Sequence, residues 1–117
     1  MEEKEVLFNG ECAYDKLGKR YPIPGNYISK SKLIPGDVLK MYFSEERGIY
    51  FKMIKGARIK YIKGVVSPKR TLLDREKEYK IHNSSYSYYQ LKAGDEIFAK
   101  IREDGGGDYC AVEGKIE

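Results

Sequence analysis

The stretch Leu33-Ile34-Pro35-Gly36-Asp37 recurs 58 residues further along the chain as Leu91-Lys92-Ala93-Gly94-Asp95. Both copies place a Leu, suited to filling a core, before a Gly-Asp pair and a strand-like run. Gly adopts a positive φ at low cost, and an Asp side chain can accept hydrogen bonds from nearby backbone N–H groups. Because both properties suit a tight turn, we predict structural turns at Gly36, Asp37, Gly94 and Asp95.

A β-hairpin pattern follows each copy of this phrase. Residues 38–54 read as a strand, a turn at 45–48 and a second strand. Residues 96–113 read the same way, with an acidic, glycine-rich turn at 103–107 that does not suit a phosphate-binding loop. An internal repeat with a shared turn chemistry predicts a pseudo-twofold domain.

The composition favours β structure throughout the chain. Of the 117 residues, 41% are hydrophobic and 34% are charged, which is typical of one compact domain. The chain contains 11 Tyr and no Trp, and Tyr favours strands. Glycines and prolines interrupt every long helical pattern, whereas alternating and short apolar runs dominate. We therefore predict an all-β protein with little helix.

Residues 21–54 resemble the swapped-hairpin motif of the AbrB and SpoVT family. The resemblance rests on Tyr21-Pro22-Ile23-Pro24, the segment 29–33, the Pro-Gly-Asp box at 35–39 and the return at 48–51. Members of that family pair two such units as a dimer, and basic residues near the hairpin ends contact duplex DNA. The resemblance implies contacts of this kind at Lys19, Arg20, Lys30 and Lys32.

A chain that carries two such units is similar to the double-psi β-barrels of the cradle-loop group. The second unit, at 79–113, matches through its Gly-Asp box and its hairpin, although it lacks the Ile-Pro phrase. In those barrels two ββ units interlock within one polypeptide. Residues 25–33 and 88–96 also resemble small bacterial proteins without an assigned function.

The repeat and the resemblance together predict a small pseudo-twofold β-barrel of the double-psi or swapped-hairpin type. We expect one barrel domain at residues 21–117, built from ββ units at about 21–66 and 79–117. Residues 1–20 are expected to form an acidic lead-in segment outside the barrel. A barrel completed within one chain is compatible with a monomer and with a homodimer.

Positive charge is concentrated in the middle of the chain. The formal net charge is +4, but residues 50–80 alone carry +7, while residues 1–15 carry −4 and residues 81–117 carry −3. Basic and apolar residues are interleaved over 51–63. A stripe of this kind would suit a polyanion, but Lys also covers the exposed faces and edges of ordinary sheets. The sequence leaves both interpretations open.

Nucleic acid is the polyanion that fits the aromatic residues of the chain. Tyrosines beside lysines can stack on unpaired bases while the lysines contact phosphates; alternatively, such tyrosines cap a core with the ring buried and the hydroxyl in water. Arg is scarce here, so any contacts should be mainly to the backbone and sensitive to salt. The candidate contact residues are Lys30, Lys32, Lys52, Lys55, Arg58, Lys60, Lys63, Lys69, Arg70, Tyr88 and Tyr89.

Little in the sequence indicates catalysis, a metal ion or a cofactor. Asp37 and Asp95 could form a carboxylate pair, but a turn role explains each of them more simply. His82 is the only histidine, and no sequence pattern pairs it with a nucleophile. Cys12 and Cys110 have no metal-ligand spacing, and they are either two reduced thiols or one disulfide. We predict no catalytic residue, no metal and no cofactor.

The sequence therefore predicts a non-enzymatic protein that binds DNA or RNA, with a regulatory role as one option. The alternative is a protein-interaction module that docks on a larger assembly. No run approaches the roughly 18 apolar residues of a membrane helix, and residues 2–5 are mostly acidic where a signal peptide would be basic. We expect no membrane contact and a cytoplasmic location.

Overall fold

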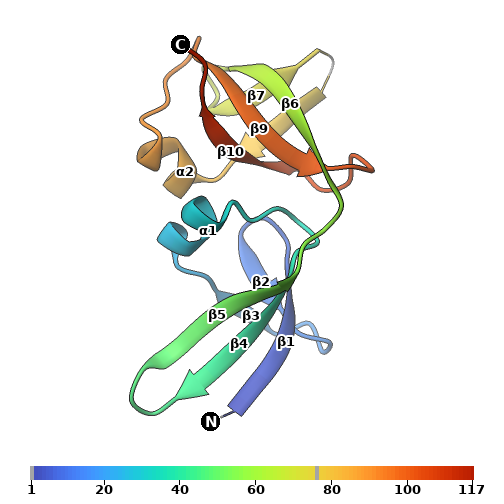
Figure 1. Ribbon diagram of the computed structural model, residues 1–117, viewed down its shortest axis with the longest axis vertical. Helices are drawn as coiled ribbons and strands as arrows, with labels where there is room; N and C mark the ends of the chain where they lie inside the picture. Colours follow the sequence, from blue (N-terminus) through green and yellow to red (C-terminus); the bar gives the residue numbers. More distant parts are fainter. Residues whose placement is uncertain (1, 76) are drawn as a thin grey trace.

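The computed structural model describes residues 2–75 and 77–117. The molecule is elongated, measuring 45 × 28 × 20 Å along its principal axes, with one sheet toward each end (Figure 1). Strands make up 51% of the chain and helices 11%, which confirms the prediction of a mostly β protein with little helix. Within the described residues, neither helix has the length and apolar character needed to cross a membrane.

Residues 2–55 form an open five-stranded antiparallel sheet in the order β3-β2-β1-β4-β5. Its elements are β1 (Glu2–Phe8), β2 (Cys12–Tyr14), β3 (Arg20–Pro22), α1 (Gly25–Ser31), β4 (Val38–Ser44) and β5 (Gly48–Lys55). One face of the sheet packs with α1 into a first core. That core includes Val6, Phe8, Ile28, Leu33, Leu39, Met41 and Phe51.

Residues 59–115 form a closed five-stranded barrel in the order β10-β8-β7-β6-β9. Its elements are β6 (Ile59–Val66), β7 (Thr71–Asp74), β8 (Lys77–Ile81), α2 (Asn83–Tyr88), β9 (Glu96–Arg102) and β10 (Tyr109–Lys115). The last strand closes the barrel because it pairs antiparallel with β9 and parallel with β8. A second core fills the interior, and it includes Val66, Leu72, Tyr79, Ile97, Ala99, Ile101 and Val112.

The repeat extends over both halves of the molecule. Each half has three strands, a helix and two strands, and β9 begins 58 residues after β4. In each half, the turn before the hairpin is hydrogen-bonded through its backbone to the end of the first strand of that half, β1 or β6. Phe8 N–H donates to the carbonyl oxygen of Asp37 at 3.0 Å, and Val66 N–H donates to that of Asp95 at 2.8 Å. The chain therefore contains two copies of one βββαββ unit.

The two units build separate sheets, which differs from the interlocked ββ units expected of a double-psi barrel. Every strand of the open sheet comes from residues 2–55, and every strand of the barrel comes from residues 59–115. The hairpins do not pair with each other because each pairs with the first strand of its own unit, β4 with β1 and β9 with β6. A barrel is present, but the second unit makes it alone.

The lead-in segment expected at residues 1–20 is part of the sheet from residue 2 onward, while Met1 lies outside the described residues. Strand β1 is the middle strand of the open sheet, and its Val6 and Phe8 are each 1% exposed. Of the five acidic residues that suggested a tail, Glu2, Glu3 and Glu5 lie exposed on this strand, while Glu11 and Asp15 lie in the turns on either side of β2. The acidic character at the start of the chain thus reflects the solvent-exposed positions of β1. The alternating apolar residues at the end of this strand are the ones that pack into the core.

One backbone hydrogen bond distinguishes the closed sheet from the open one. In the barrel, the N–H of Lys80 in β8 donates to the carbonyl oxygen of Asp108, directly before β10, at 2.6 Å. The residue 58 positions earlier is Pro22, which has no N–H to donate. The first sheet accordingly stays open between β3 and β5. On that side the ring of Tyr27 from α1 stacks on Phe51, with 6.4 Å between the ring centroids.

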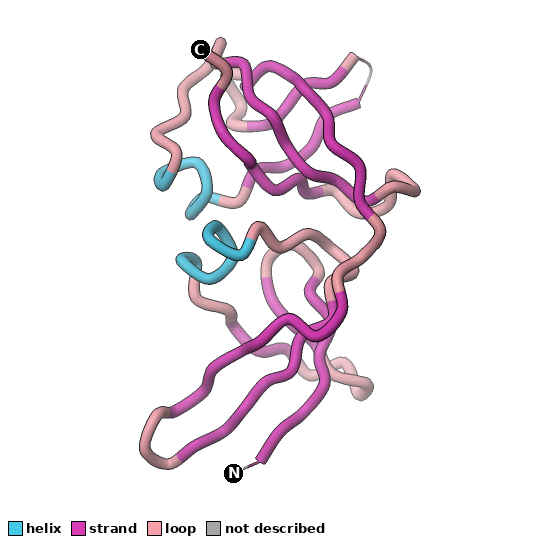
Figure 2. Tube along the Cα trace, viewed as in Figure 1, coloured by secondary structure: helices cyan, strands magenta, loops and turns pink. Residues whose placement is uncertain are grey.

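The two units contact each other through their helices and through facing loops, and Figure 2 shows α1 and α2 side by side. The ammonium group of Lys32 forms an ion pair with Glu113. The hydroxyl of Tyr109 donates to the Glu11 carboxylate at 2.5 Å. Gly10 packs so closely on the Tyr109 ring that a Cβ at this position would overlap it. These contacts join the first unit to the β10 side of the barrel.

Candidate nucleic-acid interface

The outer face of β6 and β9 carries two aromatic and two lysine side chains in a checkerboard. Tyr61 lies opposite Lys100, and Lys63 lies opposite Phe98, in the antiparallel register of the two strands. The two aromatic residues are therefore diagonal neighbours on one side of the sheet. Tyr61 is 63% exposed and Phe98 is 50% exposed. We name these four residues the aromatic–lysine face.

Strand alternation explains why these large rings are exposed. Successive side chains of a strand point to opposite sides of the sheet. The intervening residues Ile62, Ile97 and Ala99 belong to the barrel core, so Tyr61 and its neighbours on the face point outward. In β10 the residue opposite Phe98 is Gly114, which has no side chain to cover the ring.

The charges of the aromatic–lysine face are only weakly neutralised. Lys63 Nζ lies 3.8 Å from the Glu96 carboxylate, and both side chains are more than half exposed, so solvent screens this pair. Lys100 is half-buried and forms no ion pair within the described part of the chain. A phosphate group would therefore gain a contact with Lys100 and would compete only with Glu96 for Lys63.

Lys32 of the first unit is held against the barrel by its ion pair with Glu113 of β10. The hydrogen bond to Glu113 is the main cause that raises the pKa of the Lys32 ammonium group. Burial opposes this effect, and the charges of Glu113, Tyr89 and Tyr61 add to it. Tyr88 is 54% exposed and contacts Tyr89 edge to face, with 4.9 Å between centroids. Of the predicted contact residues, Tyr88 and Tyr89 thus lie side by side at the end of α2.

The other predicted contact residues are spread over both units. Lys60 lies on β6, but it points to the opposite side of the strand from Lys63. Arg70 lies over the ring of Tyr86, with 4.8 Å to the ring centroid. The rest are Lys30 on α1, Lys52 and Lys55 on β5, Arg58 between the sheets and Lys69 between β6 and β7. A continuous stripe along residues 51–63 does not form, because these residues are divided between two sheets.

Tyr61, Phe98 and Lys100 belong to the face, yet sequence reasoning selected only Lys63 of its four residues. The alternation of β9 carries a signal for the last two, since Phe98 shares its side of the strand with Glu96 and Lys100 while aliphatic residues occupy the other side. An aromatic residue among charged ones indicates an exposed ring. The register that places Tyr61 beside Phe98 is a long-range pairing, which the alternation alone does not reveal.

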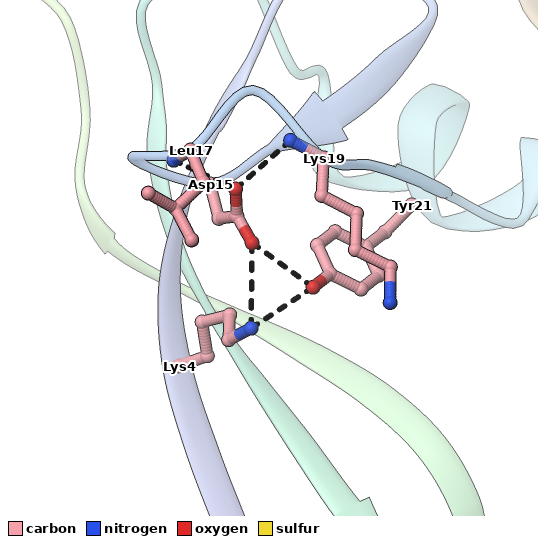
Figure 3. Close-up of polar contacts among 5 residues, drawn as sticks. All are labelled: Lys4, Asp15, Leu17, Lys19 and Tyr21. Atoms are coloured by element: carbon pink, nitrogen blue, oxygen red, sulfur yellow. Dashed lines mark hydrogen bonds and ion pairs between the residues drawn. The ribbon is translucent and has the colours of Figure 1, made fainter.

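A second polar cluster lies in the first unit, around Asp15 (Figure 3). The Asp15 carboxylate accepts hydrogen bonds from the N–H groups of Leu17 and Lys19, both at 2.9 Å. It also accepts from the Tyr21 hydroxyl at 3.1 Å and pairs with Lys4 at 3.3 Å. Burial opposes the charge of Asp15, but its hydrogen bonds outweigh this effect and lower its pKa.

The partner of this carboxylate is also held in its charged form. The hydrogen bond from Lys4 to the Tyr21 hydroxyl, 2.9 Å long, is the main cause that raises the pKa of Lys4. Because Asp15 stays ionised and Lys4 stays protonated, neither group is poised to exchange a proton near neutral pH. The cluster anchors the turn between β2 and β3.

Asp37 and Asp95 act in turns of different sheets. Asp37 is 1% exposed, and its carboxylate accepts hydrogen bonds from the N–H groups of Ile34 and Ala57, both at 2.9 Å. Asp95 accepts from the N–H of Lys92 at 2.9 Å. The Asp37 carboxylate is therefore occupied by its own turn and by the segment between the sheets, and the Asp95 carboxylate by its own turn and by Lys115.

His82 is hydrogen-bonded at the start of α2. Its Nδ1 accepts from the N–H of Ser84 at 3.1 Å and lies 2.7 Å from the Ser84 hydroxyl oxygen. Burial lowers the pKa of His82, which favours the neutral ring that can accept this capping bond. Among residues 2–75 and 77–117, no group of three His, Cys, Asp or Glu side chains is arranged to hold a metal ion.

The two cysteines are free thiols in different environments. Cys110 is 4% exposed, and burial raises its pKa to about 12, whereas Cys12 is only half-buried. Because the thiolate is the reactive form, a thiol reagent at about pH 8 should label Cys12 and leave Cys110 unmodified in the folded protein. Mass spectrometry after labelling checks this expectation, and both thiols should react in denaturant. Rapid labelling of Cys110 without denaturant would contradict it.

Comparison with known proteins identifies no relative: no protein-family model matches the chain, and no curated protein or solved structure is significantly similar to it.

Proposed function

We propose that the protein binds single-stranded nucleic acid on the aromatic–lysine face. The observation that carries the proposal is the checkerboard of two exposed rings on adjacent strands, each with a lysine on the neighbouring strand directly opposite. Exposed aromatic rings stack on unpaired bases, and ammonium groups contact the phosphates of the same strand. A duplex keeps its bases stacked inside, so a single strand is the form that these rings can reach.

The chemistry of the face favours binding without sequence selection. Bidentate hydrogen bonding to base edges is a property of Arg, Asn and Gln, whereas the cations of this face are Lys63 and Lys100. Stacking accepts every base because each base has an aromatic face. Lysine contacts to phosphate release counterions, so the affinity should fall as the salt concentration rises.

The connectivity of the barrel supports this proposal. The barrel consists of a three-stranded meander, a helix and a hairpin, and the parallel pairing of β8 with β10 closes it. This connectivity corresponds to the OB-fold, a five-stranded Greek-key barrel that often binds oligonucleotides. In that fold the second and third strands usually form the binding surface, which here means β7 and β8. That surface carries both signs of charge, because Lys77 and Lys80 lie on β8 with Glu78, and the Lys77 ammonium group donates to the carbonyl oxygen of Gly105 in the acidic loop at 103–108. A shared fold does not by itself imply a function, so the proposal rests on the aromatic–lysine face.

Fluorescence anisotropy of labelled single-stranded and duplex oligonucleotides, at two salt concentrations, tests the proposal. We expect the wild-type protein to bind single strands more tightly than duplexes, with an affinity that weakens as salt increases. Tyr61→Ala and Phe98→Ala should each lower the affinity for single strands roughly 5- to 150-fold, which corresponds to losing one base stack of about 1–3 kcal/mol.

Matched control variants show whether a loss of affinity is specific to this face or follows from removing any exposed side chain or any positive charge. Leu17→Ala truncates a side chain that is 94% exposed on the first unit, and it should leave the affinity unchanged. Lys63→Glu combined with Lys100→Glu should weaken binding, whereas Lys16→Glu combined with Arg20→Glu makes the same charge change elsewhere and should not. Equal losses from the two charge pairs, or full affinity in both aromatic variants, would refute the assignment of this face.

A further inference from the structure

We propose that two copies of the chain pair through the exposed edge of β5, so that their open sheets become one continuous sheet. The observation that carries this inference is a difference between the repeats. In the barrel, β10 has a strand on each side, β9 and β8, whereas its counterpart β5 pairs only with β4 among the described residues. An edge strand presents backbone N–H and C=O groups that can pair with another strand. This inference is independent of the proposed nucleic-acid face.

The usable part of the β5 edge is short and has defined ends. It begins at Gly48, directly after the hairpin turn. It ends before Met53, because the ring of Tyr27 stacks on Phe51 and its hydroxyl lies near the backbone of Met53. Tyr27 thus lies at the end of the edge nearest α1, and within residues 48–52 the backbone groups of Ile49 and Phe51 remain for a further strand.

The backbone groups of two residues in this segment point away from β4. Neighbouring residues of a strand direct their N–H and C=O groups to opposite sides, so Ile49 and Phe51 share the direction of Met53, which faces Tyr27. Ile49 lies opposite Phe43 on the core side of the sheet, yet it is 52% exposed. A further strand at this edge would satisfy the outward backbone groups and cover the Ile49 side chain.

The charge pattern favours a second copy of β5 as this further strand. The hairpin turn that precedes β5 is acidic, and the far end of the strand is basic. The residues concerned are Glu45, Glu46, Lys52 and Lys55, and all four are exposed. In an antiparallel pair of identical strands, the acidic turn of each copy lies beside the basic end of the other. A two-fold axis therefore makes this interface complementary to itself.

The register of the pair follows from the usable segment. Pairing residues 48–52 with the same segment of the second copy places the two-fold axis at the middle of the segment. Ile49 then lies opposite Phe51 of the second copy, and their outward backbone groups meet. Moving the axis by one residue toward α1 would instead bring Arg47 of one copy beside Lys55 of the other, which is a pair of like charges.

We expect this association to be weak. Five paired residues in each copy bury less surface than the roughly 1,200–2,000 Å² of stable complexes. Sedimentation equilibrium of the full chain at protein concentrations up to about 1 mM should therefore show a dimer that forms as the concentration rises. A protein that stays monomeric over this whole range would overturn the proposal and would leave the edge to a strand from a different protein.

Charge reversal tests the arrangement of the two copies. The turn variant, Glu45→Lys with Glu46→Lys, and the strand-end variant, Lys52→Glu with Lys55→Glu, should each weaken self-association roughly tenfold, because positions 45 and 46 of one copy then carry the same charge as the strand end of the other. An equimolar mixture of the two variants should recover association, because opposite charges face each other again in the mixed dimer.

The barrel hairpin offers a matched control for these variants. Glu103→Lys with Asp108→Lys changes the charge by the same amount at the equivalent hairpin, whose last strand already pairs with β8. This control should associate as the wild-type protein does. The proposal would also be overturned if neither the turn variant nor the strand-end variant weakened self-association. The same holds if mixing the two variants failed to restore association.

Discussion

Replacing the buried Asp37 by Ala is expected to lower the free energy of unfolding by about 3 kcal/mol or more. The Asp37 carboxylate is 1% exposed, and it accepts hydrogen bonds from the N–H groups of Ile34 and Ala57, both at 2.9 Å. Alanine would leave both donors without this acceptor. Each lost hydrogen bond to a charged group costs about 1.5–3 kcal/mol, which accounts for the expected size. Because Ala57 lies between the two sheets, the substitution should also loosen the join between the units.

The repeat provides the control for this substitution at Asp95. Asp95 occupies the equivalent turn of the barrel but is only half-buried; it accepts one backbone hydrogen bond, from Lys92, and pairs with Lys115 at 3.4 Å. We expect Asp95→Ala to lower the stability clearly less than Asp37→Ala does, and Asp37→Asn to fall between the two. Urea denaturation followed by circular dichroism measures all three variants. Equal losses at the two aspartates would show that the burial of Asp37 contributes nothing.

Gly64→Val should destabilise the barrel by about 3 kcal/mol or more, the upper end of what overpacking costs. A Cβ on Gly64 would meet the carbonyl oxygen of Leu73 and lie 2.7 Å from Leu72 Cδ1. The carbonyl oxygen belongs to the backbone of β7, so it can move aside only if the pairing of β6 with β7 is disturbed. The open sheet holds Val6 at the equivalent position, 1% exposed, which shows that only the closed sheet requires glycine here.

Thermal unfolding followed by circular dichroism measures the effect at Gly64. Gly114→Ala is the matched control within the same barrel, because a Cβ at Gly114 would have no heavy atom within 4 Å beyond its chain neighbours. This control should unfold at nearly the wild-type temperature. A Gly64→Val protein as stable as the control would mean that the barrel can widen between β6 and β7 at little cost.

The two hairpins could be predicted from the sequence because they depend on neighbouring residues. The Gly-Asp phrases and the alternating runs after them lead into β4–β5 and β9–β10, as the local chemistry indicates. The partners of these hairpins could not be predicted in the same way. Strand β1 is acidic at its exposed positions and resembles a tail until its pairing with β4 is known. The N–H of Lys80 that helps to close one sheet is missing at its counterpart Pro22, but this difference gains a meaning only once β8 is known to pair with β10.

Of the aromatic–lysine face, only Lys63 was predicted from the sequence as a contact residue, although Tyr61 stands beside it in the same run. Tyr61 and Lys63 stand in the interleaved basic and apolar run that first suggested a binding surface. Phe98 and Lys100 join them only through the register of β6 against β9, which links segments far apart in the chain. Lys60, in contrast, is separated from Lys63 by the alternation of β6 itself, which places the two lysines on opposite sides of the strand. Which lysines of β6 share a side therefore follows from the local sequence, whereas their neighbours on β9 depend on the pairing.

Because each sheet is made from a continuous piece of the chain, the molecule can fold in two stages during synthesis. Every strand pair of the first sheet is available once residue 55 has emerged from the ribosome, and the Asp37 turn then needs only the N–H of Ala57. The first unit can therefore fold before the barrel strands have been translated, as N-terminal units commonly do. The barrel must wait for β10, its last strand, which closes against β8 beside a partner that has already folded.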